Sequence, residues 1–366
     1  RQRQNMAAES GGVGPSSEGS SRPTDIPSGI FMGMGNPLLD MVVDVDMDIL
    51  HKYGVQLDSA ILAEERHLAI YDELAQKYKV QYVAGGAVLN SVRVAQWMLG
   101  APGATSYVGC VGVDSFGTEL KKCARADGIT AYLMEDFQSP TGTCAVLVHG
   151  GERSLIANLG AANDFLPQHL QTDPAKRLID AAQYYYVAGF FLTPTYGLDS
   201  ILHMAKHAVQ ADKIFMLNLS APFLIQFFQD QMAAALPYCD FVFGNESEAT
   251  TFGEVKGWGN DIGQVALKIA ALPKASGTRP RIVVITQGPN PTYVACQGKV
   301  MTFPVEPLPN ELLVDTNGAG DSFCGGFIAH MIKGEPLSDC VRAGHWAART
   351  VIQHSGCTFP KVCDYV

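Results

Sequence analysis

The sequence predicts an α/β protein with a three-layer core around a mainly parallel sheet, and a small β-rich lid. Three observations lead to this prediction. After Leu166, apolar strand patterns alternate with helical patterns through short links. At 40–48, apolar and acidic residues alternate, which is typical of a half-exposed strand and not of a strand covered on both faces. At 318–320, a turn of small residues directly precedes a helical pattern.

The elements of the first half follow from local patterns. Strands are predicted at 30–35, 40–48, 80–83 and 105–111, and helices at 64–79, 90–99 and 116–127. In the helix at 90–99, for example, Val94, Trp97 and Met98 recur at helical spacing. The strands predicted at 142–149 and 153–159 are separated by Gly150 and Gly151, which favours a hairpin.

The second half alternates regularly. Strands are expected at 184–188, 214–219, 241–243 and 282–286, with helices at 198–209, 225–235 and 261–271. A last apolar strand at 311–314 is expected to run into the small-residue turn. Such alternation predicts parallel strands whose connecting helices cover both faces of the sheet.

Three parts of the chain are distinguished. Residues 1–28 are of low complexity in Ser, Gly, Pro and Glu, and we expect them to be disordered. The large α/β/α domain is predicted to comprise 29–40, 85–140 and 163–366, and the lid 41–84 and 141–162.

Composition excludes several classes of protein. A net charge of −10 and a pI near 5.3 provide no positive surface for nucleic acid or an anionic membrane. No apolar run is long enough to cross a bilayer, so a soluble protein is expected. The nine cysteines are scattered without a C-x-x-C pair, which favours reduced thiols in a cytoplasmic protein over disulfides or a zinc site.

The small-residue turn provides the first functional indication. Gly318, Ala319 and Gly320 allow backbone N–H groups to converge where a helix begins, which makes an anion-binding nest. Asp321 follows directly, although a carboxylate repels phosphate. Its presence is explained if it accepts a proton from an alcohol that attacks the phosphate, which points to phosphoryl transfer. The alternative is an ordinary Asp N-cap, and this segment alone does not separate the two.

Polar residues also follow several of the predicted strands. Ligands of open parallel sheets bind beyond the carboxyl ends of the strands. The residues found there are Asn36, Asp40, Gly85, Gly86, Asn90, Asn218, Asn245, Glu248, Thr286 and Gly288. Each alone is explained by a turn or a cap, whereas together they indicate a binding site at one edge of the sheet.

Two segments resemble the signatures of the PfkB, or ribokinase-like, family of carbohydrate and nucleoside kinases. They are 84–90, with the sequence AGGAVLN, and 315–326, with the sequence DTNGAGDSFCGG. Further stretches, including 33–40 and 356–360, extend the resemblance to the nucleoside-phosphorylating branch of the family. The resemblance implies a ribokinase-like fold and transfer of the γ-phosphoryl group of ATP to the 5′-hydroxyl of adenosine, giving AMP and ADP.

The family pattern assigns the nucleoside to the first strand end and the double glycine. Asp40 would accept hydrogen bonds from both ribose hydroxyls, with Asn36, Asn90 and the Gly86 backbone beside it. Candidates for an apolar slot around the base are Leu38, Leu62, Leu155, Ala157 and Phe191, with the Phe191 ring flat against adenine. Without the family pattern, Asp40 would be interpreted as a solvated strand-end acid, and core packing is the alternative for Phe191.

The same family pattern predicts which residues bind the phosphates and the metal. Arg153 on the predicted hairpin would clamp the transferring phosphate, and a surface salt bridge is the alternative. Asn245 and Glu248 match the family's N-x-x-E motif and would organise Mg²⁺ through water, or simply cap a helix. The residues assigned to ATP are Asn218, Asn245, Glu248, Thr286, Gly288, Asn317 and His345. A monovalent cation such as K⁺ is a further candidate.

In the implied mechanism, Asp321 accepts the hydroxyl proton while the amides at 318–320 stabilise charge on the transferring phosphate. The expected partners are adenosine and ATP, without nucleic acid or membrane, and the chain is expected to be a monomer. A ribokinase-like sugar kinase and a catalytically silent nucleoside sensor remain as alternatives. A dinucleotide-binding enzyme is excluded, because segment 33–37 breaks the G-x-G-x-x-G pattern.

Overall fold

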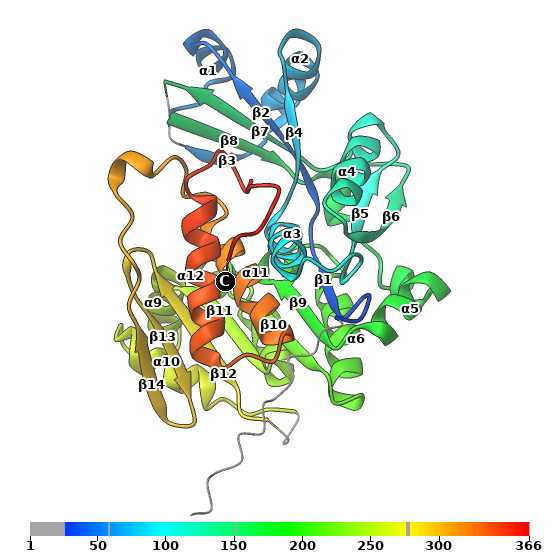
Figure 1. Ribbon diagram of the computed structural model, residues 1–366. Helices are drawn as coiled ribbons and strands as arrows, with labels where there is room; N and C mark the ends of the chain where they lie inside the picture. Colours follow the sequence, from blue (N-terminus) through cyan, green and yellow to red (C-terminus); the bar gives the residue numbers. More distant parts are fainter. Residues whose placement is uncertain (1–25, 58, 151, 276–278, 366) are drawn as a thin grey trace, which may run out of the picture.

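The computed structural model describes residues 26–57, 59–150, 152–275 and 279–365. The predicted disorder of residues 1–28 falls almost wholly outside these ranges. Within them, the chain forms a nine-stranded sheet with helices on both faces and a separate five-stranded sheet. The smaller sheet stands above the larger one in Figure 1. No helix in the described ranges is long and apolar enough to cross a membrane.

The large sheet has the strand order β14-β13-β12-β11-β10-β9-β1-β5-β6. Its strands are β1 (Phe31–Met34), β5 (Thr105–Gly112), β6 (Thr130–Asp136), β9 (Tyr184–Ala188), β10 (Ile214–Asn218), β11 (Phe241–Asn245), β12 (Ile282–Gln287), β13 (Asn290–Cys296) and β14 (Lys299–Phe303). The neighbouring strands β12, β11, β10, β9, β1, β5 and β6 all run parallel to one another. Strands β13 and β14 add an antiparallel edge. The predicted mainly parallel sheet is confirmed.

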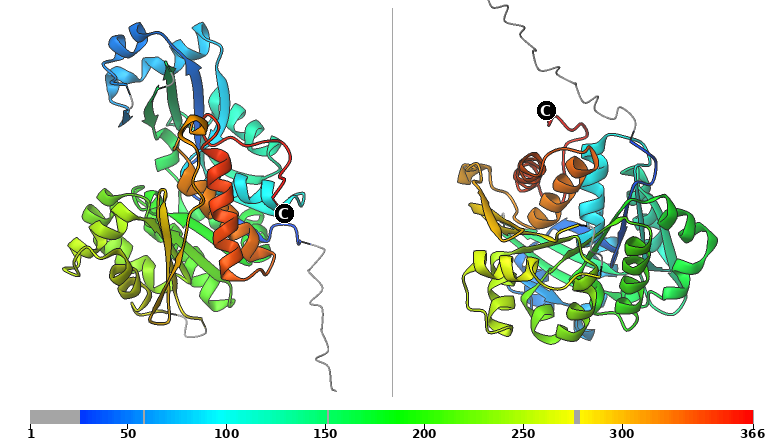
Figure 2. Two further views of the ribbon diagram at one scale, coloured as in Figure 1. Left: turned by 60° about the vertical axis from the view of Figure 1, so that its left-hand side comes forward. Right: turned by 90° about the horizontal axis from the view of Figure 1, so that it is seen from below.

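Helices cover both faces because successive residues of a strand point to opposite sides of the sheet. Tyr186 belongs to a buried cluster with helices α3 (Ala87–Leu99), α4 (Ser115–Ala126), α11 (Ala319–Ile332) and α12 (Leu337–Val351). Its neighbour Tyr185 belongs to a second cluster with α5 (Asp173–Ala181), α6 (Gly197–Gln210), α7 (Pro222–Phe227), α8 (Gln229–Ala235), α9 (Glu246–Val255) and α10 (Ile262–Ala270). The right-hand view of Figure 2 shows the sheet between these two layers. The three-layer α/β/α core is therefore confirmed.

The five-stranded sheet, here called the lid sheet, has the order β3-β8-β7-β2-β4. Its strands are β2 (Leu38–Asp44), β3 (Ala60–Leu62), β4 (Gln81–Gly85), β7 (Thr143–His149) and β8 (Glu152–Asn158). Met41 and Ile156 point to the face covered by α1 (Met47–Tyr53) and α2 (Ala69–Lys77). Asp40 and Leu155 alternate with them and point to the other face of the lid sheet. The domain boundaries given above stay a prediction.

The strand predicted at 311–314 is wrong. A short 3₁₀ turn, η6 (Asn310–Leu312), stands there, and Leu312, Leu313 and Val314 are exposed. The N–H groups of Val314 and Asp315 both donate to the carbonyl of Ile352, at 2.9 and 3.1 Å, and not to a neighbouring strand. An apolar run alone therefore did not identify a strand, because a strand also needs a partner for its backbone.

Other predicted elements differ in their bounds. The strand expected at 40–48 ends at Asp44, and α1 begins at Met47. The helix expected at 225–235 is divided into α7 and α8 at Phe228. Elements without a sequence prediction are β3, β6, β13, β14, α1, α5 and α12, and α9 was considered only as the helix that Asn245 and Glu248 would cap. Since β3, β6 and β14 are sheet edges, they lack the long apolar run of a buried strand.

Further 3₁₀ turns connect the larger elements. They are η1 (Glu65–His67), η2 (Gly160–Asn163), η3 (Pro167–Gln171), η4 (Gly189–Leu192) and η5 (Leu236–Tyr238). Among them, η4 follows β9 directly and thus continues the chain from the centre of the sheet into the functional edge.

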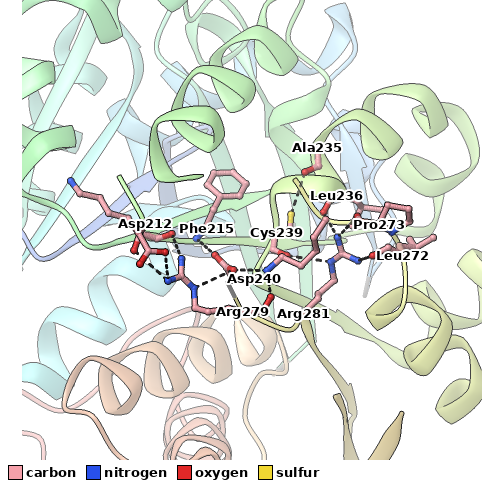
Figure 3. A network of polar contacts seen from close by, with 12 residues as sticks. Asp212, Phe215, Ala235, Leu236, Cys239, Asp240, Leu272, Pro273, Arg279 and Arg281 are labelled. Carbon is pink, nitrogen blue, oxygen red and sulfur yellow. Dashed lines mark hydrogen bonds and ion pairs between the residues drawn. The ribbon is translucent and has the colours of Figure 1, made fainter. Parts of the chain in front are cut away.

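A buried arginine supports the fold away from that edge (Figure 3). Arg281, only 1% exposed, stands directly before β12. Its guanidinium donates to backbone carbonyls at 2.7–3.2 Å; these belong to Leu236, Cys239, Ile269, Leu272 and Pro273. Carbonyls at helix C-terminal ends carry partial negative charge, so they compensate the cation. Asp240, beside it, pairs instead with Lys274 and Arg279.

We expect Arg281→Met to lower the free energy of unfolding by about 3 kcal/mol or more, because several buried carbonyls lose their donor. Urea unfolding followed by circular dichroism measures this. Arg342→Met is the matched control, since Arg342 is largely exposed and pairs only at the surface with Asp339; its effect should stay within about 0.5 kcal/mol. Equal stability of the two variants would contradict the structural role of Arg281.

Candidate active site

A cavity of about 420 Å³ opens at the carboxyl ends of β10, β11 and β12. Open parallel sheets bind ligands at this edge. Of the residues singled out from the sequence, those lining the cavity are Asn218, Asn245, Glu248, Thr286, Asn317, Gly318, Ala319, Gly320 and Asp321. They come from three strand ends and from the turn before α11, so distant parts of the chain converge on one site.

The turn before α11 forms one wall of the cavity. Gly318 has φ 77°, a left-handed conformation that favours glycine, and α11 begins at the next residue. The first N–H groups of a helix have no partner within it. Because 318–321 line the cavity, these donors and the positive end of the helix lie where an anion can bind.

Asp315 holds this turn in place. Its carboxylate accepts hydrogen bonds from the N–H groups of Asn317 and Gly356, at 2.9 and 2.8 Å. It also forms a buried ion pair with Arg153 of β8. The lid sheet and the nest are therefore joined through one carboxylate. The surface salt bridge considered for Arg153 is excluded, because both partners are buried.

Asp321 is the carboxylate at the mouth of the nest. It is partly covered and lines the cavity, and Nδ2 of Asn90 donates to its Oδ2 at 3.0 Å. Burial raises the pKa of Asp321 to about 6, and the bond from Asn90 opposes this rise. Above that pH the group is an ionised acceptor next to an anion-binding turn, which is the protonation state that a base requires.

The double glycine makes room for Asp40. A Cβ at Gly85 would overlap the Asp40 carboxylate, and a Cβ at Gly86 would overlap the carbonyl oxygen of Asn36. Gly86 also has φ 96°, outside the range of other residues, where it precedes α3. Burial raises the pKa of Asp40 to about 7. The sequence GG is therefore a steric requirement of the close packing between β2, β4 and α3.

Glu248 is a third carboxylate of this edge. It closes a capping box at the start of α9, where the Asn245 N–H donates to Glu248 and the Glu248 N–H donates to Asn245, at 3.0 and 2.9 Å. Burial raises the pKa of Glu248 to about 7. The helix cap and the cavity position coexist, because the carboxylate that caps the helix also lines the cavity.

The remaining nucleoside candidates lie on or near the lid sheet. Leu155 and Ala157 are half-buried and alternate with the core residue Ile156 on β8. Leu38 is half-buried at the start of β2, and Leu62 on the edge strand β3 is 66% exposed. Asn36 lies between β1 and β2, and its Nδ2 donates to the carbonyl of Ala162 at 3.4 Å.

The structure corrects the prediction for Phe191. Its side chain is fully buried, and its ring meets the edge of Phe165 with the centroids 5.5 Å apart. Phe190 lines the cavity instead and lies 6.2 Å from the ring of Phe223. Because η4 is a 3₁₀ turn, consecutive side chains point in different directions, and the sequence FF did not reveal which ring faces outward.

The other ATP candidates divide into two groups. Asn218 lines the cavity with its amide held by the chain, since its Nδ2 donates to the Tyr186 hydroxyl at 3.2 Å and its Oδ1 accepts from the Ser220 N–H at 2.9 Å. Gly288 and His345 are not among the residues that line the cavity. Nε2 of His345 is 2.8 Å from Oγ1 of Thr292, and burial lowers the pKa of His345.

Several residues of the site had no role assigned to them from the sequence, although Ala87, Thr316 and Cys324 lie within the two family signatures. Those lining the cavity include Ala87, Phe190, Ser220, Thr316 and Cys324. Ser220 adopts φ 72°, which is strained for a residue other than glycine, and its Oγ accepts from the Gly189 N–H at 2.8 Å. No local sequence pattern signals such strain, because it is imposed by the packing of neighbouring strand ends.

Comparison with known proteins identifies the family to which this chain belongs. The model of the pfkB family of carbohydrate kinases matches residues 50–362. The chain belongs to this family. Adenosine kinase 1 of Arabidopsis thaliana is 53% identical over 338 residues, which cover 92% of this chain and 98% of the relative. The family match covers both segments, 84–90 and 315–326, that resemble the family signatures.

Two solved structures of the same family are similar along most of the chain. Anopheles gambiae adenosine kinase, in complex with P1,P4-di(adenosine-5) tetraphosphate, is 46% identical with a TM-score of 0.82, covering 91% of this chain and 99% of that one. Schistosoma mansoni adenosine kinase, in complex with adenosine and AMP, is 40% identical with a TM-score of 0.80, covering 91% and 98%.

The raised pKa of Asp321 predicts a pH-dependent stability difference. Because the folded-state pKa of about 6 lies above the ordinary value of 3.8, protonation of Asp321 stabilises the folded state relative to the unfolded state. This contribution is fully present below pH 4 and is lost as the pH rises through 6. We expect Asp321→Asn to gain stability relative to the parent as the pH rises between these values, by about 3 kcal/mol. Urea unfolding at pH 4 and pH 8 measures this.

Asp230→Asn is the matched control, because Asp230 is exposed in the first turn of α8. Its stability should stay within about 0.5 kcal/mol of the parent at both pH values, because it is a surface substitution. A pH-independent difference for Asp321→Asn would mean that the carboxyl of Asp321 is solvated like a surface acid.

Proposed function

We propose that this chain is an adenosine kinase, which transfers the γ-phosphoryl group of ATP to the 5′-hydroxyl of adenosine and forms AMP and ADP. One observation of the site carries the proposal: Asp321 lines the cavity together with residues 318–320, whose turn leads into the N-terminus of α11. An anion site combined with a carboxylate acceptor suits an alcohol attacking a phosphate.

The relatives support adenosine as the acceptor. The Schistosoma mansoni enzyme binds adenosine and AMP, which are the acceptor and product of this reaction. The Anopheles gambiae enzyme binds a ligand with adenosine at both ends of a phosphate chain. We assign the ribose to Asp40, Asn36, Asn90 and the Gly86 backbone, because a carboxylate accepts from two neighbouring hydroxyls.

The base is assigned to apolar residues of the lid sheet. Leu38, Leu155 and Ala157 are half-buried on its exposed face, and Phe190 provides an aromatic ring on the side of the cavity. Leu62 would join them at the edge strand. An apolar slot lined by an aromatic ring favours a purine over a free sugar, since a flat ring can stack on it.

Asp321 acts in this mechanism as the proton acceptor. The ionised carboxylate orients the 5′-hydroxyl and takes its proton as the bond to phosphorus forms. In a loose transition state the proton moves late, so the position of the base matters more than its strength. The amides of 318–320 and the N-terminus of α11 stabilise the charge that develops on the phosphate oxygens.

ATP is assigned to the strand-end side of the cavity, along Asn218, Thr286 and Asn317, with Gly288 and His345 beyond it. Mg²⁺ would be organised through water by Glu248 and Asn245, and it would neutralise charge between the phosphates. No group of three or more His, Cys, Asp and Glu side chains suited to a metal is found in the described ranges. A monovalent cation such as K⁺, and a monomeric state, complete the proposal.

Arg153 is assigned to the transferring phosphate. It lies on β8 of the lid sheet and pairs with Asp315, whose neighbour Thr316 lines the cavity. A guanidinium carries donors that suit a phosphate as well as a carboxylate. Movement of the lid sheet would bring it from one acceptor to the other while water is excluded.

The activity test offers adenosine, inosine, ribose and fructose in parallel, with ATP and Mg²⁺, and measures ADP release. We expect turnover with adenosine, and a fall in kcat of about 10² to 10⁴ in Asp321→Asn, because the proton acceptor is lost. Asp230→Asn should retain the activity of the parent.

The other outcomes identify the alternatives. Turnover with the sugars and not with adenosine would indicate a sugar kinase. Binding of adenosine in calorimetry without turnover of any substrate would indicate a sensor. Full activity of Asp321→Asn would show that Asp321 is not the proton acceptor.

Arg153 has a separate test. We expect Arg153→Met to lower kcat by about a hundredfold, because a donor to the transferring phosphate is lost, while Arg153→Lys recovers part of it through its charge. Steady-state kinetics with both substrates measures the effect. A raised KM at unchanged kcat would mean that Arg153 forms its ion pair with Asp315 but does not bind the transferring phosphate.

A further inference from the structure

Arg93 lies on α3 behind the cavity, three residues after Asn90 and therefore on the same side of the helix. It is 5% exposed. Its Nε donates to Oδ2 of Asp127 at 2.5 Å, and its Nη1 donates to the carbonyl oxygen of Cys357 at 2.9 Å. The guanidinium also lies over the ring of Phe359, 5.4 Å from its centroid. Two segments of the chain, at Asp127 and at 357–359, thus hold this cation in place.

The same guanidinium reaches the active site through Asn90. Nη1 of Arg93 donates to Oδ1 of Asn90 at 3.4 Å, the long end of the hydrogen-bond range, and Nδ2 of Asn90 donates to Asp321 at 3.0 Å. An amide has an oxygen that only accepts and a nitrogen that only donates. Because Arg93 can only donate, it favours the orientation in which the Asn90 NH₂ group faces Asp321. Without Arg93 the amide can turn its oxygen toward the carboxylate.

Arg93 also affects the second carboxylate of the site, Asp40. Burial raises the pKa of Asp40, the positive charge of Arg93 opposes the rise, and Asp321 adds to it. Two thiols, Cys144 and Cys357, also interact with Asp40, and burial raises their pKa values so that they stay neutral. Within the described part of the chain, Arg93 is the cation that favours the ionised form of Asp40.

We propose that Arg93 is a positioning residue for phosphoryl transfer: it orients the Asn90 amide so that its NH₂ group faces the proposed base, Asp321. The inference rests on the proposed function. The effect of the Arg93 charge on Asp40 provides a second readout, the pH dependence of kcat/KM, which a merely structural residue would not change.

The experiment compares three variants with the parent over about pH 5 to pH 9, measuring kcat and kcat/KM for adenosine. Arg93→Met removes both the charge and the donors. Arg93→Lys keeps the charge but lacks the forked donors. Asp127→Asn is the matched control, because it breaks the ion pair and leaves the contacts of Arg93 with Asn90 and Cys357. Thermal melting of each variant reports folding.

For Arg93→Met, we expect kcat to fall about tenfold to a hundredfold, since Asn90 no longer orients the base. The acid limb of kcat/KM should move to higher pH by about one unit, because Asp40 loses its neighbouring cation and ionises at higher pH. Arg93→Lys should restore the acid limb but not kcat. Asp127→Asn should keep both close to the parent.

Three results would overturn the proposal. They are unchanged kinetics in Arg93→Met, a loss of activity without movement of the acid limb, and the same loss in Asp127→Asn. If Arg93→Met does not fold, Arg93→Lys and Asp127→Asn decide: equal kcat in these two variants contradicts the positioning role. A parent protein that neither binds adenosine in calorimetry nor phosphorylates it would refute the proposed function itself, independently of the variants.

Discussion

The site depends on keeping carboxylates partly desolvated beside an anion-binding turn. Burial raises the pKa values of Asp40 and Glu248 to about 7 and that of Asp321 to about 6, so each is held at some cost to stability. Few cations offset the cost of burying these carboxylates, because a cation in direct contact with the base would lower the tendency of the base to accept a proton. The surrounding structure instead provides neutral donors, such as the Asn90 amide and the backbone of Asn245.

The glycines and the Asp315 network follow from the same constraint. Gly85 and Gly86 allow α3 to begin next to the Asp40 carboxylate, and side chains there would overlap it or the neighbouring backbone. The Asp315 carboxylate accepts a hydrogen bond from the turn and forms an ion pair with Arg153. These contacts join the lid sheet to the turn. The turn before α11 is thus held by hydrogen bonds to Asp315, while the connection to the lid sheet rests on the ion pair between Asp315 and Arg153.

Much of the fold was predictable because buried parallel strands and their helices have strong local patterns. The strands from β9 to β12, the hairpin of β7 and β8, and the nest before α11 all follow from such patterns. The edge strands β6 and β14 and the segment at 311–314 were missed or wrong, since their state depends on whether a partner strand is present. For the site, the motifs led to Asp321 and the double glycine, but not to Arg93 or Ser220.

The sequence by itself determined the fold class, the family and the residues of the two signatures, because glycine turns, capping residues and apolar periodicity act over short distances along the chain. Only the tertiary structure decided that Phe190 and not Phe191 faces the cavity, that Arg153 pairs with Asp315, and that Arg93 supports Asn90. The reason is physical: which way a ring points, or which partner a charge meets, depends on packing between segments that local sequence patterns do not connect, such as β8 and the turn that contains Asp315.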